Sequence, residues 1–167
     1  MKLILSEKAY RIIVNECRSV IGTETGGILI GKKINEQHIV VPFALGPGPK
    51  TKRSCFRYAP DVRWQQVYLD KLFDRHGVNY VGSYHLHPGN NHLPSYQDLK
   101  TARKITSDPD WNVKEAIFPI INLTDNQISF YPYFFLRASK GFQPIVWQIV
   151  NHNDRLIKSV LKRRDNP

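Results

Sequence analysis

Residues 84–88 read Tyr84-His85-Leu86-His87-Pro88, and residues 95–98 read Ser95-Tyr96-Gln97-Asp98. The apolar residues before His85 predict a strand over 78–86, and Ser95 is a residue type that begins helices. Side chains at i and i+2 point to the same face of a strand, so His85 and His87 can face one ion while Leu86 turns into the core. Asp98, one turn into the predicted helix, can face back toward them.

Two histidines and one carboxylate are a ligand set for zinc, and they leave the fourth tetrahedral position open, as hydrolytic zinc sites require. A zinc ion held there would lower the pKa of a coordinated water toward about 7 and polarise a scissile carbonyl. Each part of the pattern has another interpretation. An H-x-H on a strand occurs by chance, and S-x-x-D alone matches a helix capping box. The combination is much rarer, and one residue can both cap and ligate.

A third element lies upstream, where Thr23-Glu24-Thr25-Gly26-Gly27-Ile28-Leu29-Ile30-Gly31 places an acid before a glycine-rich apolar run. With H-x-H-P and S-x-x-D, this run resembles the JAMM (also MPN or JAB) zinc metallopeptidase family. Residues 46–49 (Gly-Pro-Gly-Pro) and 56–61 are similar to its bacterial-type branch, and the resemblance covers roughly residues 5–135. Leu86 departs from the Ser or Thr that many members carry between the histidines, at a position that should face away from the metal.

The resemblance implies a role for each matching residue. Zinc would be held by His85, His87 and Asp98. Glu24 would act as the catalytic base, taking a proton from the attacking water and passing it to the leaving amine. Ser95 would donate a hydrogen bond to the oxyanion of the tetrahedral intermediate. From the sequence alone, Glu24 could equally be a charged residue at the start of a strand.

The function implied by the family is that of a zinc-dependent peptidase or isopeptidase. It would cleave after the C-terminal glycine of a ubiquitin-like modifier, in deconjugation or precursor processing. The bacterial-type match implies an antiviral pathway resembling ubiquitin conjugation, with activating and conjugating enzymes of the same operon as partners. A lower-ranked enzymatic role is the processing of a sulfur-carrier protein. The chain after Asp98 is short before the next strand, so selectivity for one type of ubiquitin-chain linkage is not expected.

Two non-enzymatic alternatives stay open. Some members of the family are non-catalytic scaffolds, but those have lost ligands or the upstream glutamate, and this chain keeps all five positions. The net charge of +10 could instead serve a nucleic-acid-associated module, although a solvated basic surface explains it equally well. The loop from Gly46 to Ser54 and the strand after it are the candidate groove for an extended substrate. Its tentative substrate contacts are Lys50, Lys52, Arg53 and Arg57.

The expected fold is a single α/β domain over residues 1–167, an MPN/JAB (cytidine-deaminase-like) α-β-α sandwich around a central mixed sheet. Strands are predicted over 2–5, 25–34, 37–45, 55–58, 78–86, 116–123, 127–136 and 145–150. A helix is predicted over 6–20, with Ser6 as its cap, and a second over 61–76, which Asp61 opens and Gly77 ends. The candidate core contacts of this second helix are Val62, Val67, Leu69 and Phe73. A third helix is predicted over 95–106, and a basic C-terminal helix over about 153–164. A zinc deaminase would share this architecture but needs P-C-x-x-C, and the two cysteines, Cys17 and Cys55, are 38 positions apart.

The composition fits a cytoplasmic protein. No apolar run approaches the roughly 20 residues that span a bilayer, and the apolar run at residues 3–5 is too short for a secretory signal. Two cysteines fit a reducing compartment, in which both would be packing residues. Among the other histidines, His92 lies in the loop between the expected ligands, where it could gate the metal.

Overall fold

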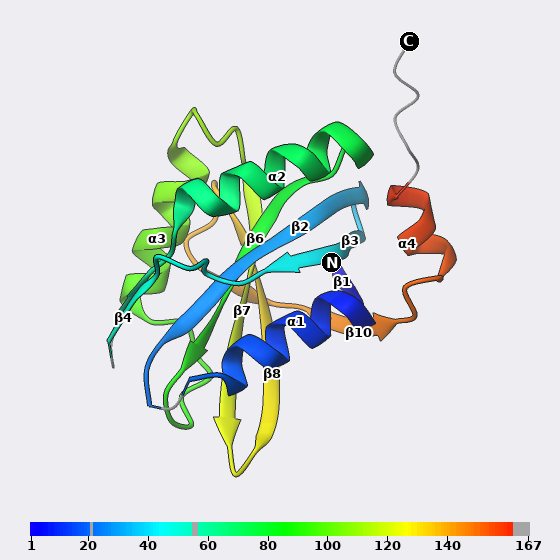
Figure 1. Cartoon of the computed structure of the whole chain (residues 1–167). Coiled ribbons are helices and arrows are strands. Elements are labelled where there is room, and N and C mark those ends of the chain that lie inside the picture. Colours follow the sequence, from blue (N-terminus) through cyan, green and yellow to red (C-terminus); the bar gives the residue numbers. More distant parts are fainter. Residues whose placement is uncertain (21, 55–56, 162–167) are drawn as a thin grey trace.

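The computed structural model describes residues 1–20, 22–54 and 57–161, without the side chain of Arg57 (Figure 1). The strands of this part of the chain are β1 (Lys2–Ser6), β2 (Thr25–Asn35), β3 (His38–Leu45), β4 (Lys52–Ser54), β5 (Arg57–Ala59), β6 (Asn79–His87), β7 (Glu115–Thr124), β8 (Gln127–Leu136), β9 (Gln143–Pro144) and β10 (Val146–Val150). The helices are α1 (Glu7–Arg18), α2 (Val62–His76), α3 (Tyr96–Ser107) and α4 (Arg155–Val160).

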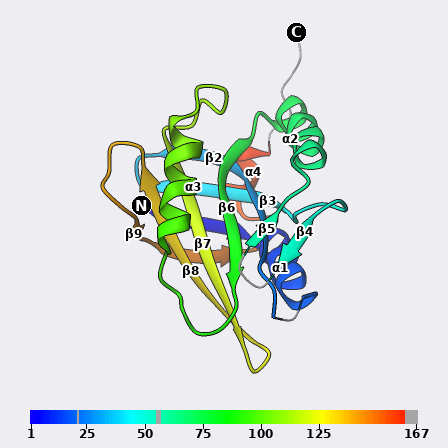
Figure 2. The same cartoon turned by 90° about the vertical axis from the view of Figure 1, so that its left-hand side faces the viewer.

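Eight strands form one mixed sheet in the order β10-β1-β3-β2-β6-β7-β8-β9, and β4 pairs with β5 in a separate hairpin. The pairs β10–β1, β1–β3 and β6–β7 are parallel, and the other neighbours are antiparallel. Strand β6 therefore lies inside the sheet, with β7 and β8 on one side and β2 and β3 on the other (Figure 2). A parallel neighbour on one side and an antiparallel one on the other bring three strand ends close together where β6 stops.

Apolar side chains cover both faces of this sheet, and helices pack on each. One core cluster joins Ala9, Ile13 and Cys17 of α1 to one face. A second cluster joins the opposite face to Ala102 of α3 and to Ile157 of α4, with partly buried leucines of α2 against it. The predicted α-β-α sandwich with a central mixed sheet is confirmed.

The predicted helix starts and stops are visible as specific contacts. The Ser6 hydroxyl accepts the Ala9 N–H at 3.0 Å, which begins α1, and Asp61 accepts the Trp64 N–H at 3.2 Å, which begins α2. Gly77 ends α2 in the left-handed conformation that glycine adopts readily. The first helix ends at Arg18, two residues before the predicted end at Val20, and the N–H of its C-cap residue Ser19 bonds to the carbonyls of Asn15 and Glu16.

Other predictions are wrong or lie outside the described residues. Strand β4 lies inside the predicted loop 46–54 because it pairs with β5, a neighbour that only the folded chain provides. Of the four residues of α2 predicted to contact the core, Val62, Val67 and Phe73 are exposed. The fourth, Leu69, packs against the core, as does Leu72. Cys55 and residues 162–164 of the predicted C-terminal helix lie outside the described residues.

Two glycines let the strand after Glu24 approach its neighbours closely. A Cβ atom on Gly26 would lie 2.2 Å from the Tyr84 carbonyl oxygen and 2.5 Å from the Tyr58 hydroxyl. A Cβ on Gly27 would lie 1.9 Å from the Leu45 carbonyl oxygen. All three distances are shorter than van der Waals contact, so these positions require glycine. The register pairs Gly26 with His85, so Glu24 stands beside the end of β6.

Candidate metal centre

The two histidines of the H-x-H pattern end strand β6, in the middle of the sheet. His85 and His87 face the same side and approach each other, with 2.7 Å between their Nε2 atoms. Leu86, between them, is buried in the core cluster on the opposite face. The structure thus confirms the alternation that the strand pattern predicts.

Asp98 completes the group from the first turn of α3. Its Oδ1 atom lies 3.1 Å from Nε2 of His85, and its Oδ2 atom lies 3.5 Å from Nε2 of His87. The three side chains are only 10 to 16% exposed. Within the described residues, these are the three that group closely enough to hold a metal ion, with ligand atoms within 4.8 Å of one another.

The geometry of this group suits a tetrahedral ion. With bonds of about 2.0–2.1 Å, as zinc makes to nitrogen and oxygen, the ligand atoms of a tetrahedral site lie roughly 3.3–3.4 Å apart. The two nitrogen–oxygen distances are close to that separation. The two imidazoles would open by about half an ångström to admit the ion. The donor set and its spacing therefore fit zinc.

The protonation of His87 is set by a backbone partner. Its Nδ1 atom lies 3.0 Å from the carbonyl oxygen of Asn91. A carbonyl oxygen can only accept, so Nδ1 carries the hydrogen and donates it. In the neutral ring the lone pair is then on Nε2, the atom that faces Asp98 and His85. A hydrogen bond of this type orients a ligating histidine and fixes its tautomer.

Asn122 holds the loop that supplies this carbonyl. It lies on β7 opposite His87, is 5% exposed, and its amide nitrogen lies 2.8 Å from the Gly89 oxygen and 3.2 Å from the Asn91 oxygen. No sequence motif singles out this residue. The signal that could have revealed it is a lone amide near the end of a strand otherwise made of apolar residues, because buried polar side chains need partners.

The charge state of Asp98 follows from its neighbours. Burial alone would raise the pKa of the carboxyl, but the hydrogen bonds to His85 and His87 outweigh it and hold the pKa well below its usual range. For His87 the signs are reversed. Burial lowers the pKa of the ring, but the hydrogen bonds to Asp98 and to the Asn91 carbonyl outweigh this effect and raise the pKa. Asp98 is therefore an anion that faces two imidazole rings. Its negative charge favours a positive charge beside it, either a proton on a ring or a metal ion.

Ser95 and Asp98 also form the capping box that the pattern S-x-x-D predicts. The Ser95 hydroxyl accepts the Asp98 N–H at 3.2 Å, and Asp98 Oδ2 accepts the Ser95 N–H at 2.6 Å. This contact fixes the Asp98 carboxylate while leaving Oδ1 toward His85. Because the Ser95 hydroxyl is an acceptor in the cap, its own hydrogen is available for donation. Capping and a role toward an oxyanion are compatible in this geometry.

Glu24 shares a groove with the metal group. The groove has a volume of about 730 Å³ and is lined by Glu24, His85 and Asp98 together with residues of α2 and α3. The basic residues along it are Lys100 and Lys104 of α3, which no motif in the sequence singles out. An acid, two of the three side chains that could hold a metal ion, and an open cleft therefore meet at one place.

The basic residues predicted to contact substrate are arranged differently. Lys50 and Lys52 are exposed, and neither lines the groove. Arg53 makes an ion pair with Glu16 at 2.9 Å, which turns it toward α1. The side chain of Arg57 lies outside the described part of the chain. Among the described side chains of the predicted segment 46–58, Tyr58 lines the groove, and Pro60, just beyond the segment, lines it as well.

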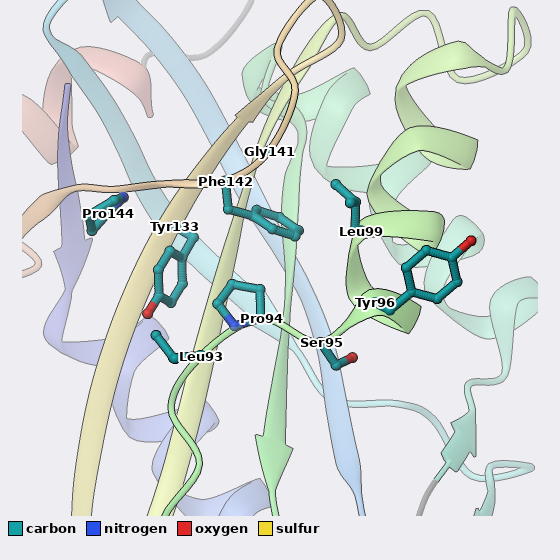
Figure 3. A pocket seen from close by; sticks show the side chains of 9 residues that line it. All are labelled: Leu93, Pro94, Ser95, Tyr96, Leu99, Tyr133, Gly141, Phe142 and Pro144. Carbon is teal, nitrogen blue, oxygen red and sulfur yellow. The ribbon is translucent and has the colours of Figure 1, made fainter.

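A second hollow lies on the other side of the first turn of α3 (Figure 3). It has a volume of about 550 Å³ and is lined mainly by apolar side chains of the α3 start and of the segment between β8 and β9. Phe142, Leu99 and Pro94 point toward one another across it. Ser95 lines this hollow and Asp98 lines the groove, so the capping box stands between the two.

His92 lies in the loop between the ligands but is not one of the three residues that group for a metal. Its ring stacks on Tyr131 with ring centroids 4.6 Å apart, and its carbonyl accepts the Tyr133 hydroxyl at 3.1 Å. These contacts hold the loop against β8. A gating role for His92 stays a prediction.

None of the helices in the described residues has the length and apolar character needed to cross a membrane.

Among curated proteins, the chain is 28% identical over 122 residues to a CD-NTase/cGAS isopeptidase of Enterobacter hormaechei subsp. hoffmannii (strain UCI 50), covering 71% of this chain and 66% of that protein. It is 29% identical over 101 residues to a protein of the same description from Escherichia coli (strain TW11681), covering 59% of this chain and 64% of that protein. The chain thus spans just under two thirds of the length of these relatives.

The fold has a solved counterpart. Protein DSY2949 from Desulfitobacterium hafniense, known from a solution structure, superimposes with a TM-score of 0.64 at 16% identity, over 89% of this chain and 93% of that one. This likeness concerns the fold alone.

The model of the family described as prokaryotic homologs of the JAB domain matches residues 6–139, which include Glu24, both histidines, Ser95 and Asp98. The chain therefore belongs to the prokaryotic JAB-domain family.

Proposed function

We propose that this protein is a zinc-dependent peptidase that cleaves a peptide or isopeptide bond after the C-terminal glycine of a ubiquitin-like modifier. The observation that carries the proposal is the convergence of His85, His87 and Asp98 beside a groove that Glu24 also lines. A ligand set without a nearby acid would fit a structural or storage site equally well. The acid in the groove favours hydrolysis.

In this proposal His85, His87 and Asp98 hold the ion, which when bound polarises the scissile carbonyl and activates water. Glu24 takes the proton of the attacking water and delivers it to the leaving amine. Tyr58 and Pro60 form part of the groove wall on the β5 side. The buried Asn122 keeps His87 in the tautomer that leaves Nε2 free.

Ser95 is the proposed donor to the oxyanion that develops on the carbonyl oxygen. Its hydroxyl stands at the N-terminus of α3, where the helix also presents unpaired backbone N–H groups. A donor fixed before the reaction lowers the barrier because it needs no reorganisation as charge develops. The capping contact with Asp98 provides this fixation.

The positions of the groove and of the apolar hollow suit a substrate in an extended conformation. A chain that crosses the first turn of α3 would enter the groove on one side and the apolar hollow on the other, with its scissile bond over the ligands. Glycine at the cleavage site would let the backbone approach closely, because it has no Cβ. Lys100 and Lys104 would favour acidic side chains in the groove, and Lys50 and Lys52 remain predicted contacts for an acidic patch farther out.

The names of the two curated relatives suggest a first substrate to test. Both are described as isopeptidases of CD-NTase/cGAS, so we propose a conjugate between a ubiquitin-like modifier and a CD-NTase as the candidate substrate. The antiviral setting and the partnership with activating and conjugating enzymes are part of the same proposal. Cytoplasmic location is proposed with them.

The test uses a ubiquitin-fold protein whose terminal glycine is joined either to a fluorescent reporter or to a lysine of a CD-NTase. Incubation with the zinc-loaded protein, followed by mass spectrometry, should reveal a new carboxyl terminus at that glycine. A chelator should prevent the cleavage. Scattered cleavage of unfolded proteins would indicate a general protease instead, and release of a terminal residue from a sulfur carrier would favour the lower-ranked role. Salt-sensitive binding of DNA with no cleavage of any probe would contradict the proposal.

A further inference from the structure

A cluster of three side chains ties together α1, the start of β2 and the β4–β5 hairpin. The Thr25 hydroxyl donates to Oε1 of Glu16 at 2.5 Å. Arg53 reaches the same carboxylate oxygen through Nη2 at 2.9 Å and the Thr25 hydroxyl through Nε at 3.2 Å. Each of the three residues therefore contacts the other two, and we refer to them as the Glu16 cluster.

The cluster is largely shielded from water. Thr25 is fully buried, and the side chains of Glu16 and Arg53 are 17% and 30% exposed. The hydroxyl of Thr25 uses both of its capacities, as a donor to Glu16 and as an acceptor from Arg53. An arginine bound through two of its nitrogens is held in one orientation, which a single contact would not achieve. The cluster is therefore a rigid joint between three elements.

This joint stands directly beside Glu24. Thr25 is the next residue in the chain, and the Glu24 N–H donates to the carbonyl of Ser54, the neighbour of Arg53, at 3.1 Å. The backbone of Glu24 is thus fixed from two directions, through Thr25 to α1 and through Ser54 to β4. Beyond it, the Tyr58 ring of β5 packs against Gly26. Any movement of the hairpin would be transmitted to Glu24.

We propose that Glu16 and Arg53 are positioning residues that hold Glu24 in line with the metal ligands. Arg53, predicted from the sequence to contact substrate, thereby acts on the site from behind. This inference rests on the proposed function, in which Glu24 is the base. It does not depend on the identity of the substrate.

The first test uses amide hydrogen exchange of the metal-free, full-length chain, so it needs neither zinc nor a substrate. Glu16→Gln should speed exchange of the Glu24 and Thr25 amides by about tenfold, because the opening of this segment becomes easier. The matched control is Glu115→Gln, since Lys33 of the same strand pairs with Glu115 at 2.9 Å with both side chains 26% exposed. The control should leave exchange at Glu24 unchanged. Unchanged exchange at Glu24 in Glu16→Gln would overturn the proposal.

The second test measures turnover of the glycine-linked reporter by the zinc-loaded protein. Misplacing a catalytic group by about an ångström costs up to a hundredfold, so Glu16→Gln should lower kcat about tenfold to a hundredfold. KM should stay within about twofold, since the cluster does not line the groove. Arg53→Lys keeps the charge but loses the two-nitrogen contact, so its kcat should fall between those of wild type and Glu16→Gln. If the kcat of Glu16→Gln equalled that of the control Glu115→Gln, the positioning role would be overturned.

A double variant separates this inference from the function on which it rests. If Glu16 acts through Glu24, then adding Glu16→Gln to Glu24→Gln should lower kcat no further. Losses that multiply would show that Glu16 acts elsewhere and would overturn the inference alone. A fully active Glu24→Gln would instead overturn the assignment of the base, and with it both proposals.

Discussion

The Nε2 atom of His85 lies 3.1 Å from the Oδ1 atom of Asp98, although a loop and the first turn of a helix separate the two residues in sequence. A strand end in the middle of the sheet supplies one partner, and a capped helix supplies the other. The fold therefore brings together three side chains that could hold a metal ion, with ligand atoms within 4.8 Å of one another. Preformed ligands lower the cost of binding a metal, because less chain has to be ordered when it binds.

The role of Glu24 can be separated from ligation by one substitution. Glu24→Gln keeps the shape of the side chain but cannot accept a proton, so kcat for the glycine-linked reporter should fall by about a hundredfold to ten-thousandfold. Zinc content should stay at the wild-type level, because Glu24 is outside the group of three ligands. Reporter kinetics and elemental analysis on the same preparation measure both. An emptied metal site in this variant would make Glu24 a ligand.

Ser95 has a capping role and a proposed role as oxyanion donor, and one substitution separates the two. Loss of the cap should cost about 1 kcal/mol of unfolding free energy, whereas loss of an oxyanion donor should lower kcat by on the order of a hundredfold. Ser95→Ala is therefore expected to be far more damaging in the kinetic assay than in a denaturant titration. Ser6→Ala, which removes the cap of α1, is the matched control for stability. A destabilised Ser95→Ala with wild-type kcat would leave only the capping role.

Asn122 should matter for metal affinity without touching the metal. Asn122→Ala removes the donors that hold the carbonyls of Gly89 and Asn91. The loop would loosen, and the partner that fixes the His87 ring would be lost. Changes of this kind typically weaken metal binding by about tenfold to a hundredfold. A competition titration against a chelator measures the change, with circular dichroism to establish folding; unaltered affinity in a folded variant would show that the loop holds itself in place.

Zinc binding should weaken in acid, and the sign follows from His87. Burial lowers the pKa of this ring, but the hydrogen bonds to Asp98 and to the Asn91 carbonyl outweigh it and raise the pKa. A raised pKa means that the ring keeps its proton to a higher pH, and a protonated histidine cannot ligate. Affinity should be constant well above that pKa and fall as the pH decreases through it. Titrations between about pH 8 and pH 5 test this, and a pH-independent affinity would count against histidine ligation.

Much of this architecture could be predicted from the sequence because its signals are local. Alternating apolar residues, Ser6 and Asp61 as caps and Gly77 as a stop each report on a few neighbouring positions. The close approach of His85, His87 and Asp98 was predictable for the same reason, since H-x-H on a strand and S-x-x-D at a helix start fix the side-chain directions.

Contacts between distant segments were not predictable. Arg53 looked like a substrate contact because nothing near it in sequence reveals Glu16, 37 positions away. Asn122 contacts a loop more than 30 positions away. The exposed Val62 of α2 and the groove lysines of α3 depend on how far each helix is rotated against the sheet, and weak periodicity does not determine that angle. Tertiary packing decides these features.

The zinc content of the purified protein, measured together with its activity, tests the proposed metal site. We predict about one zinc ion per chain by elemental analysis, loss of reporter cleavage when a chelator removes it, and recovery when zinc is returned. His85→Ala and Asp98→Ala should each lower the zinc content, whereas Glu24→Gln should not. A metal-free preparation that cleaves the reporter at the wild-type rate would contradict the central claim.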